Sequence, residues 1–166
     1  MYDLIIIGAK ASGIAGAIAA HSRQLKTLVV AKTKQPENNQ ESLGLISSES
    51  LFGSFQAVLK NSKFVEAKFG AEIVNLEKNI VSFSLESKDG KIFYGKSVLI
   101  TVSGKNLSFD QLTQKTSEGR IAVNRHQETG TPGIWAAGEC ADGFVGGLEA
   151  AVGEAVKAVY GIKIKA

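Results

Sequence analysis

The pattern of apolar and polar positions predicts that the chain begins with a strand, a tight turn, a helix and a second strand. Residues 2–7 form a short apolar run rich in β-branched side chains, typical of a strand buried on both faces. A glycine-bearing turn follows over residues 8–13, then an alanine-rich helical stretch over residues 12–24 and a second apolar run over residues 27–30. This order predicts a βαβ unit, in which the two strands are parallel and the crossover is right-handed.

The rest of the pattern predicts a mixture of strands between two further helices. Residues 32–50 are polar and without periodicity, so we expect a loop there, followed by a helix over residues 53–69 that Gly70 ends. Strands are expected over residues 72–76, 80–85, 92–94, 98–102, 121–123 and 133–137, with a hairpin turn at Asp89-Gly90 and a last helix over residues 146–160. The order predicts a three-layer α/β domain of Rossmann type, with a parallel sheet and an inserted antiparallel β-ribbon.

Length and composition narrow the class of protein. We expect residues 1–166 to form a single domain, since 44% of them are hydrophobic and only 21% are charged. The net charge of +3 comes from basic residues that are spread along the chain, so we predict no nucleic-acid partner. The apolar run near the N-terminus is too short to span a bilayer, and we expect a soluble, cytoplasmic protein without a membrane partner. With one cysteine, Cys140, the chain cannot form an internal disulfide.

The turn after the first predicted strand is an imperfect dinucleotide fingerprint. It reads Gly8, Ala9, Lys10, Ala11, Ser12, Gly13. Its first glycine would make the tight turn and its last would let helix and strand pack closely, but Lys10 stands where a glycine usually approaches the diphosphate. Lys10 is therefore either a phosphate partner or a sign of a lost site. The acid that often holds the ribose after the second strand is also missing, because Ala31 and Lys32 stand there. Lys32 or backbone groups would have to hold a ribose.

A second motif lies near the end of the chain. The segment 131–139 has a proline-glycine turn, a short apolar strand, two small residues, and a glycine followed by an acid, Gly138-Glu139. It resembles the second FAD motif of the thioredoxin reductase family, which belongs to the pyridine nucleotide-disulfide oxidoreductases. The resemblance implies that the chain is a flavoprotein, that FAD is its cofactor, and that Glu139 accepts a hydrogen bond from the ribityl chain. The family has an aspartate at this place, so Glu139 keeps the charge and adds a methylene.

Other segments are similar to the same family in the same order. Residues 3–8 resemble its opening, residues 69–73 the entry to its middle strand, and residues 98–104 its apolar strand ending in Ala-Thr-Gly, here Ser103-Gly104. Residues 149–155 resemble its last helix, whose N-terminus faces the pyrimidine ring of the flavin. The resemblance implies that the amides of Gly146, Gly147 and Leu148 lie there, where the helix dipole would stabilise negative charge on reduced flavin.

Two parts of the family pattern are missing. The family inserts an NAD(P)H-binding domain after the Ala-Thr-Gly strand, but here only a short polar segment separates Gly104 from Arg120. The redox-active Cys-x-x-Cys of that inserted domain is absent as well. We therefore expect that this chain by itself does not reduce thioredoxin with NADPH.

Three hypotheses about function remain open at this point. The first is a minimal FAD-dependent oxidoreductase or electron-transfer protein, which works with a separate donor and acceptor and whose open flavin face favours a redox partner protein or a homodimer. The second is a cofactor-free or weakly nucleotide-binding scaffold descended from a flavin reductase domain, and the third is one half of a split reductase. No residue stands out as an acid, base or nucleophile, and we predict no metal site. Cys140 is either a packing residue or a redox group near the cofactor.

Overall fold

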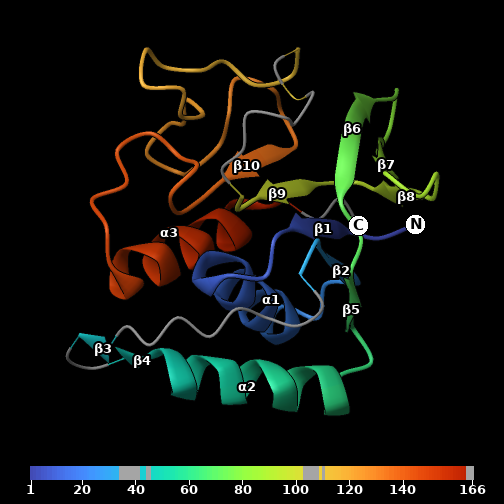
Figure 1. The fold of residues 1–166 in the computed structure, drawn as a ribbon. Helices are drawn as coiled ribbons and strands as arrows, with labels where there is room; N and C mark the ends of the chain where they lie inside the picture. The colour runs from blue at the N-terminus through green and yellow to red at the C-terminus, as the bar shows by residue number, and fades with distance from the viewer. Residues whose placement is uncertain (34–41, 44–45, 103–108, 110, 164–166) are drawn as a thin grey trace.

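The computed structural model of the chain describes residues 1–33, 42–43, 46–102, 109 and 111–163, and these contain a parallel sheet of five strands (Figure 1). The strand order is β10-β9-β1-β2-β5, and every neighbouring pair is parallel. The bounds are β1 Leu4–Ile7, β2 Thr27–Ala31, β5 Val65–Phe69, β9 Val98–Ile100 and β10 Ile134–Ala136. The expected βαβ unit is present, because β1 pairs with β2 from Leu4 opposite Thr27 to Ile7 opposite Val30.

Helices cover one face of this sheet and a small antiparallel sheet covers the other (Figure 1). The helices are α1 Ala11–Ser22, α2 Ser48–Asn61 and α3 Leu148–Gly161. The antiparallel sheet has the order β6-β7-β8, with bounds Ile73–Lys78, Phe83–Ser87 and Ile92–Gly95, and a two-residue pair, β3 Ser42–Leu43 and β4 Ile46–Ser47, precedes α2. The prediction of a three-layer α/β fold with a parallel sheet and an inserted antiparallel ribbon is confirmed.

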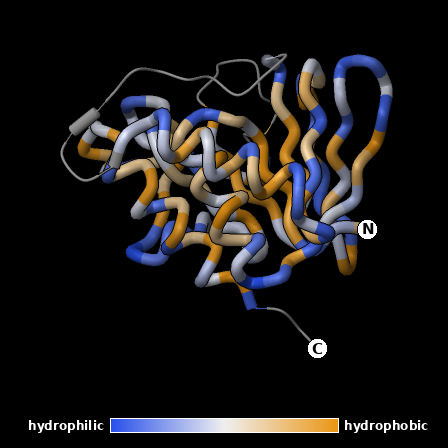
Figure 2. Tube along the Cα trace, turned by 90° about the horizontal axis from the view of Figure 1, so that it is seen from below, coloured by the Kyte–Doolittle hydropathy of each residue, from blue (hydrophilic) through white to orange (hydrophobic). Residues whose placement is uncertain are grey.

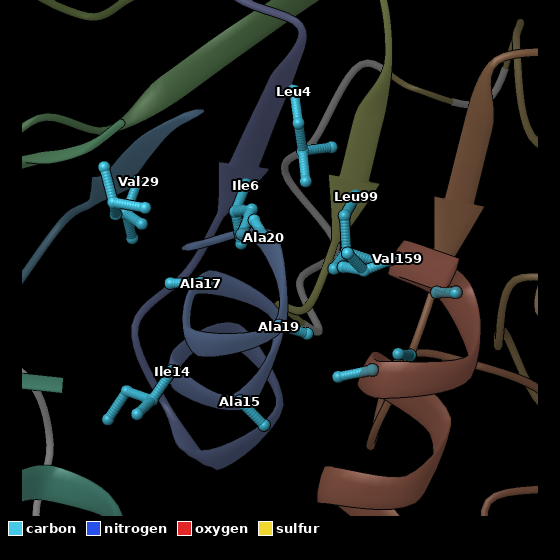
Figure 3. Packing of buried hydrophobic residues seen from close by; sticks show 14 of the residues in the cluster. Leu4, Ile6, Ile14, Ala15, Ala17, Ala19, Ala20, Val29, Leu99 and Val159 are labelled. Carbon is cyan, nitrogen blue, oxygen red and sulfur yellow. The ribbon is translucent and has the colours of Figure 1, made fainter. Parts of the chain in front are cut away.

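The core consists of two layers, because successive residues of a strand point to opposite faces of a sheet. Leu4 and Ile6 of β1 pack against the helices, and Ile5 and Ile7 pack against the antiparallel sheet. Figure 3 shows Leu4, Ile6 and Leu99 on the helical face of the sheet, with Ala20 of α1 next to Ile6. In Figure 2 the hydrophobic positions gather along the central strands and hydrophilic ones occupy many outer turns. Strands β1 and β9 are therefore apolar throughout, and β2 is apolar after Thr27, as the sequence pattern predicted.

The prediction of one helix over residues 53–69 is wrong at both ends. Helix α2 begins at Ser48 and ends at Asn61, and residues 65–69 form β5, which pairs with β2 along the edge of the sheet. Ser62 ends the helix with an extended backbone, and its hydroxyl accepts hydrogen bonds from the N–H groups of Phe64 and Val65. The apolar side chains on both sides of Ser62 have helical spacing by coincidence, so periodicity alone joined a helix to a strand.

The segment before β10 also differs from its prediction. Residues 121–123 form no strand, and Ile121 makes only isolated bridges, one of them to Ala141. The expected loop over residues 32–50 lies partly outside the described residues, and its described part holds β3, β4 and the first residues of α2, so the prediction of a loop is wrong there. Among the described residues, no helix is both long and apolar enough to cross a membrane.

Candidate functional site

A cavity of about 180 Å³ lies where the order of the parallel sheet reverses. The chain runs from β1 to β2 and β5 on one side and then returns to β9 on the other side of β1, so the carboxyl ends of β1 and β9 mark a topological switch point. The lining residues follow the carboxyl ends of strands or begin helices: Lys10, Ala11, Ser12, Ile14, Ser48, Leu51, Thr101, Gly138, Glu139, Phe144, Gly146, Gly147, Leu148 and Ala151. Open α/β sheets bind ligands in this position.

Each of the three helices in the described part of the chain presents its first turn to this cavity. Ala11 and Ser12 belong to α1, Ser48 to α2 and Leu148 to α3. The first amides of a helix have no partner inside the helix, and its N-terminal end carries a partial positive charge. The exposed Lys10 directly precedes α1 and lines the same cavity. The arrangement therefore favours an anionic group, although Glu49 and Glu149 in the first turns of α2 and α3 reduce the positive potential.

The glycine turn has the shape that its first and last glycines predict. Gly8 has a φ of +112°, and a Cβ on it would lie 2.6 Å from Oγ1 of Thr101. A Cβ on Gly13 would lie 2.1 Å from the carbonyl oxygen of Gly8. Thr101 fixes the opposite side, because its hydroxyl donates to the carbonyl of Ile7 over 2.8 Å. Lys10 has a φ of −83° and an extended backbone, so a side chain causes no backbone strain at that position.

The two sequence motifs meet at Gly138. A Cβ on this residue, whose φ is +79°, would lie 2.7 Å from Oγ of Ser12. The N–H of Gly138 donates to Oε2 of Glu154, in the second turn of α3, over 2.8 Å. The exposed Glu139 follows and lines the cavity. Residues far apart in the sequence thus bring the start of α1 and the end of β10 into direct contact.

The loop between β10 and α3 is held by a second segment of the chain. The N–H of Ile121 donates to the carbonyl of Cys140 over 2.7 Å, and the N–H of Asp142 donates to the carbonyl of Ile121 over 2.8 Å. Nη1 of Arg120 donates to the carbonyl of Phe144 over 3.1 Å. These contacts fix the loop that carries Glu139 at its start and Gly146-Gly147 at its end.

Burial changes the pKa values of two ionisable groups beside the cavity, Cys140 and Glu154. Burial raises the pKa of the Cys140 thiol to about 12, and the charges of Glu154 and Glu139 act in the same direction. Sγ of Cys140 donates to the carbonyl of Ile100 over 3.2 Å. Burial also raises the pKa of Glu154, whereas its bond to Gly138 and the charges of Lys157 and Arg120 lower it. A thiol with this pKa is mostly protonated at neutral pH, which favours the packing interpretation of Cys140 over the redox one.

The structure brings most of the residues singled out in the sequence to one place. Lys10, Ala11, Ser12, Gly138, Glu139, Gly146, Gly147 and Leu148 line the cavity. Gly8, Ala9 and Gly13 shape the adjoining turn without lining the cavity. Ala31 is buried at the end of β2. Nζ of Lys32 lies 3.0 Å from Oε1 of Glu72, and neither residue lines the cavity. Ser103 and Gly104 lie outside the described residues.

Sequence reasoning missed several residues that line the cavity, and it missed Glu154, which contacts Gly138 without lining the cavity. Thr101 directly follows β9, so its place at a strand end was a signal, but the family resemblance pointed to Ser103 and Gly104 instead. Ser48 and Leu51 belong to the first turn of α2, which begins five residues before the helix that periodicity predicted. The helix start carries an N-cap signal, because the hydroxyl of Ser47 accepts from the N–H of Ser50. Glu154 had no signal in the sequence, since only the packing of α3 against β10 brings it to Gly138.

The fold is that of a Rossmann-type α/β protein, with a cavity at the switch point of its sheet. The sequence profile of the pyridine nucleotide-disulphide oxidoreductases matches residues 46–159, which is more than half of the chain. The chain therefore belongs to this family, and its class is that of the oxidoreductases. No curated protein shows a significant sequence match to it.

Solved structures share the fold at low sequence identity. The thioredoxin reductase of T. acidophilum superposes with a TM-score of 0.76 at 14% identity, and the match covers 96% of each chain. The thioredoxin reductase of Lactococcus lactis gives 0.76 at 13% identity, covering 96% of this chain and 97% of the other. A ferredoxin-flavin thioredoxin reductase from Clostridium acetobutylicum gives 0.76 at 16% identity, covering 96% and 95%. The predicted resemblance to a thioredoxin reductase-like domain is confirmed at the level of family and fold.

Proposed function

We propose that the chain is a flavoprotein that binds FAD non-covalently in this cavity and exchanges electrons with a separate donor and acceptor. One observation carries the proposal: the first turns of α1, α2 and α3 converge with Lys10 on one cavity at the switch point of the sheet. The partial positive charges of helix N-termini and the charge of Lys10 suit a diphosphate. Membership of the family supports a flavin as the group that carries it.

The residues present fit FAD along the cavity. Gly8 and Gly13 leave room for a tight turn, after which Lys10, Ala11 and Ser12 would hold the pyrophosphate. Gly138 has no side chain to obstruct the approach, and Glu139 would accept hydrogen bonds from the ribityl hydroxyls. The backbone from Gly146 to Leu148 would lie beside the pyrimidine ring. Ala31 and Lys32 would contribute near the adenosine ribose only through backbone groups, because the Lys32 ammonium pairs with Glu72.

The volume of the cavity bears on how much of the cofactor it encloses. Pockets that enclose a drug-sized ligand measure roughly 300–1,000 Å³. The cavity formed by the described residues measures about 180 Å³, so it would take only a part of FAD. We therefore expect that part of the bound cofactor remains exposed, where a redox partner protein or a second copy of the chain can reach it.

The chemistry would come from the cofactor, with the protein supplying orientation and electrostatics. FAD, when bound, supplies the capacity to accept and release electrons and protons. The N-terminus of α3 would stabilise negative charge on the ring, and Glu139 would orient the ribityl chain. We assign no acid, base or nucleophile, and the protonated, buried Cys140 is unsuited to thiol exchange.

A separate electron donor follows from the short internal segment. Only residues 105–119 lie between Gly104 and Arg120, where thioredoxin reductases carry their NAD(P)H-binding domain. The structural neighbour from Clostridium acetobutylicum is described by its name as a ferredoxin-flavin enzyme, which supports a protein as the donor here. A split reductase, with a nucleotide-binding partner on another chain, is the second candidate that the same short segment favours.

The proposal is tested by the visible spectrum of the purified chain after incubation with FAD and removal of the excess. We expect flavin absorption bands that survive desalting, and weaker retention of riboflavin, which lacks the diphosphate. If the bands persist, reduction by NADH, NADPH and a reduced ferredoxin distinguishes the donors, and co-purification of a nucleotide-binding chain indicates a split reductase. A folded protein, judged by circular dichroism, that retains no flavin contradicts the proposal and favours the cofactor-free scaffold.

A further inference from the structure

Glu154 makes an unusual contact at the end of an edge strand. In a parallel strand, successive N–H groups point to alternate sides. The N–H of Ala136 donates to the carbonyl of Gln127 and the N–H of Ala137 to that of Ile100, whereas the N–H of Gly138, just beyond β10, donates to a side chain. A buried N–H needs an acceptor. Oε2 of Glu154 provides it over 2.8 Å, reaching from α3 to the carboxyl end of β10.

Gly138 is closely confined by its neighbours. It lies against Ser12 so closely that a Cβ would be 2.7 Å from the serine hydroxyl oxygen, and its φ of +79° suits glycine. The peptide on its other side leads directly to Glu139, which lines the cavity. An acceptor that holds the Gly138 amide therefore holds the backbone from which Glu139 extends, relative to the start of α1.

The far end of the same loop is held independently. Arg120 bonds the carbonyl of Phe144, and the backbone of Ile121 bonds Cys140 and Asp142. Glu154 thus holds the beginning of the loop, while residues 120–121 hold its middle and end. A partly buried carboxylate is unfavourable by itself, and here its hydrogen bond to an N–H offsets part of that cost.

We propose that Glu154 is a positioning residue of the cofactor site, which holds the Gly138 amide and thereby sets Glu139 over the cavity. The inference rests on the proposed FAD site. Glu154 acts through Gly138, because it is not among the residues that line the cavity. The acceptor oxygen, rather than the negative charge, is the feature that matters.

The experiment compares two variants of equal size in the full chain. Glu154→Gln keeps an acceptor oxygen and loses the charge, and Glu154→Met loses both while it fills the space. Glu86→Ala removes an exposed carboxylate from β7, far from the cavity lining, and serves as the control. Two quantities are measured: hydrogen exchange of the Gly138 amide without flavin, and the dissociation constant for FAD from the quenching of flavin fluorescence.

We expect Glu154→Met to speed exchange at Gly138 and to weaken FAD binding, each about tenfold, the effect of leaving one buried N–H without its acceptor. Glu154→Gln and Glu86→Ala should stay close to the wild-type values in both measurements. The inference is overturned if Glu154→Met leaves exchange unchanged, or if Glu154→Gln is as impaired as Glu154→Met. If the wild-type chain binds no FAD, the proposed function fails separately, and the exchange measurement still decides whether Glu154 holds the loop. If Glu154→Met does not fold, the smaller Glu154→Ala takes its place.

Discussion

Gly13 lies so close to Gly8 that a Cβ on Gly13 would be 2.1 Å from the carbonyl oxygen of Gly8. Gly8 directly follows β1 and Gly13 lies in the first turn of α1, and their contact lets the helix begin close to the strand. No side chain fits between them, because the obstructing atom belongs to the backbone and cannot rotate away. The turn that opens the candidate site is therefore set by backbone packing.

We expect Gly13→Ala to lower the free energy of unfolding by about 3 kcal/mol, because the methyl group forces the turn apart. The matched control is Gly153→Ala on the exposed side of α3, where a Cβ meets nothing within 4 Å. That change should raise the free energy of unfolding by about 0.5–1 kcal/mol through helix propensity. Urea denaturation followed by circular dichroism measures both, and equal effects would contradict the packing argument.

Lys10 distinguishes a phosphate-binding site from one that has been lost. If the ammonium binds the diphosphate of FAD, Lys10→Gly should weaken FAD binding about fivefold and reduce its dependence on salt. If the side chain obstructs the site, the same variant restores the usual glycine and should bind FAD more tightly. Lys32→Ala is the control, because this lysine is exposed, pairs with Glu72 and lies outside the cavity lining. Fluorescence titration at low and high salt measures the effect.

We expect Cys140 to be unreactive in the native protein. Burial raises the pKa of its thiol to about 12, so at pH 8 little thiolate is present and access is blocked. A disulfide reagent such as dithiobis-nitrobenzoate should therefore label the chain only after it is unfolded in denaturant. Rapid stoichiometric labelling of the native protein would return the redox role of Cys140 to consideration.

Gln24 occupies a position that favours glycine. It follows α1 with a φ of +56°, and its N–H donates to the carbonyl of His21 at the end of that helix. A left-handed residue directly after a helix is most often glycine. Gln24→Gly should therefore raise the free energy of unfolding by about 1 kcal/mol. The same exchange at the exposed Gln56, inside α2, should lower it by about 1 kcal/mol, and thermal denaturation of the pair gives the signs.

Tyr2 predicts a loss of stability at high pH. Burial, followed by the hydrogen bond to Glu66 and its charge, raises the pKa of Tyr2 from 10.0 to about 12. The unfolded chain loses this proton near pH 10 while the folded chain keeps it. The stabilisation of the folded state by the protonated Tyr2 is therefore complete below pH 10 and is lost as the pH rises to about 12. Tyr2→Phe should lack this pH-dependent part of the free energy of unfolding, which is measured for both proteins by urea denaturation at pH 8, 10 and 11. Parallel curves for the two proteins would show that the tyrosine does not contribute.

The sequence determined the elements whose side chains have a single kind of environment. The apolar runs at Leu4–Ile7 and Val98–Ile100 are buried on both faces, so their composition alone identifies them as central strands. Gly8 and Gly13 identified the turn between β1 and α1, because only glycine suits the conformation and the contact there. Two motifs in the expected order then indicated the family that the profile match shows.

Tertiary structure decided what depends on neighbours distant in the sequence. Residues 65–69 became a strand because β2 offers an open edge, which periodicity around Ser62 could not reveal. Lys32 pairs with Glu72 because the residues after β5 continue beside the end of β2, where the N–H of Ala71 donates to the carbonyl of Ala31, and Glu154 reaches Gly138 only because α3 packs against β10. Local composition records which side chains can be buried, but the partner of a polar group is chosen by whatever the folded chain brings within hydrogen-bond distance. For this protein the motifs could therefore be recognised in the sequence, whereas the residues that hold them in place were determined only by the packing of the fold.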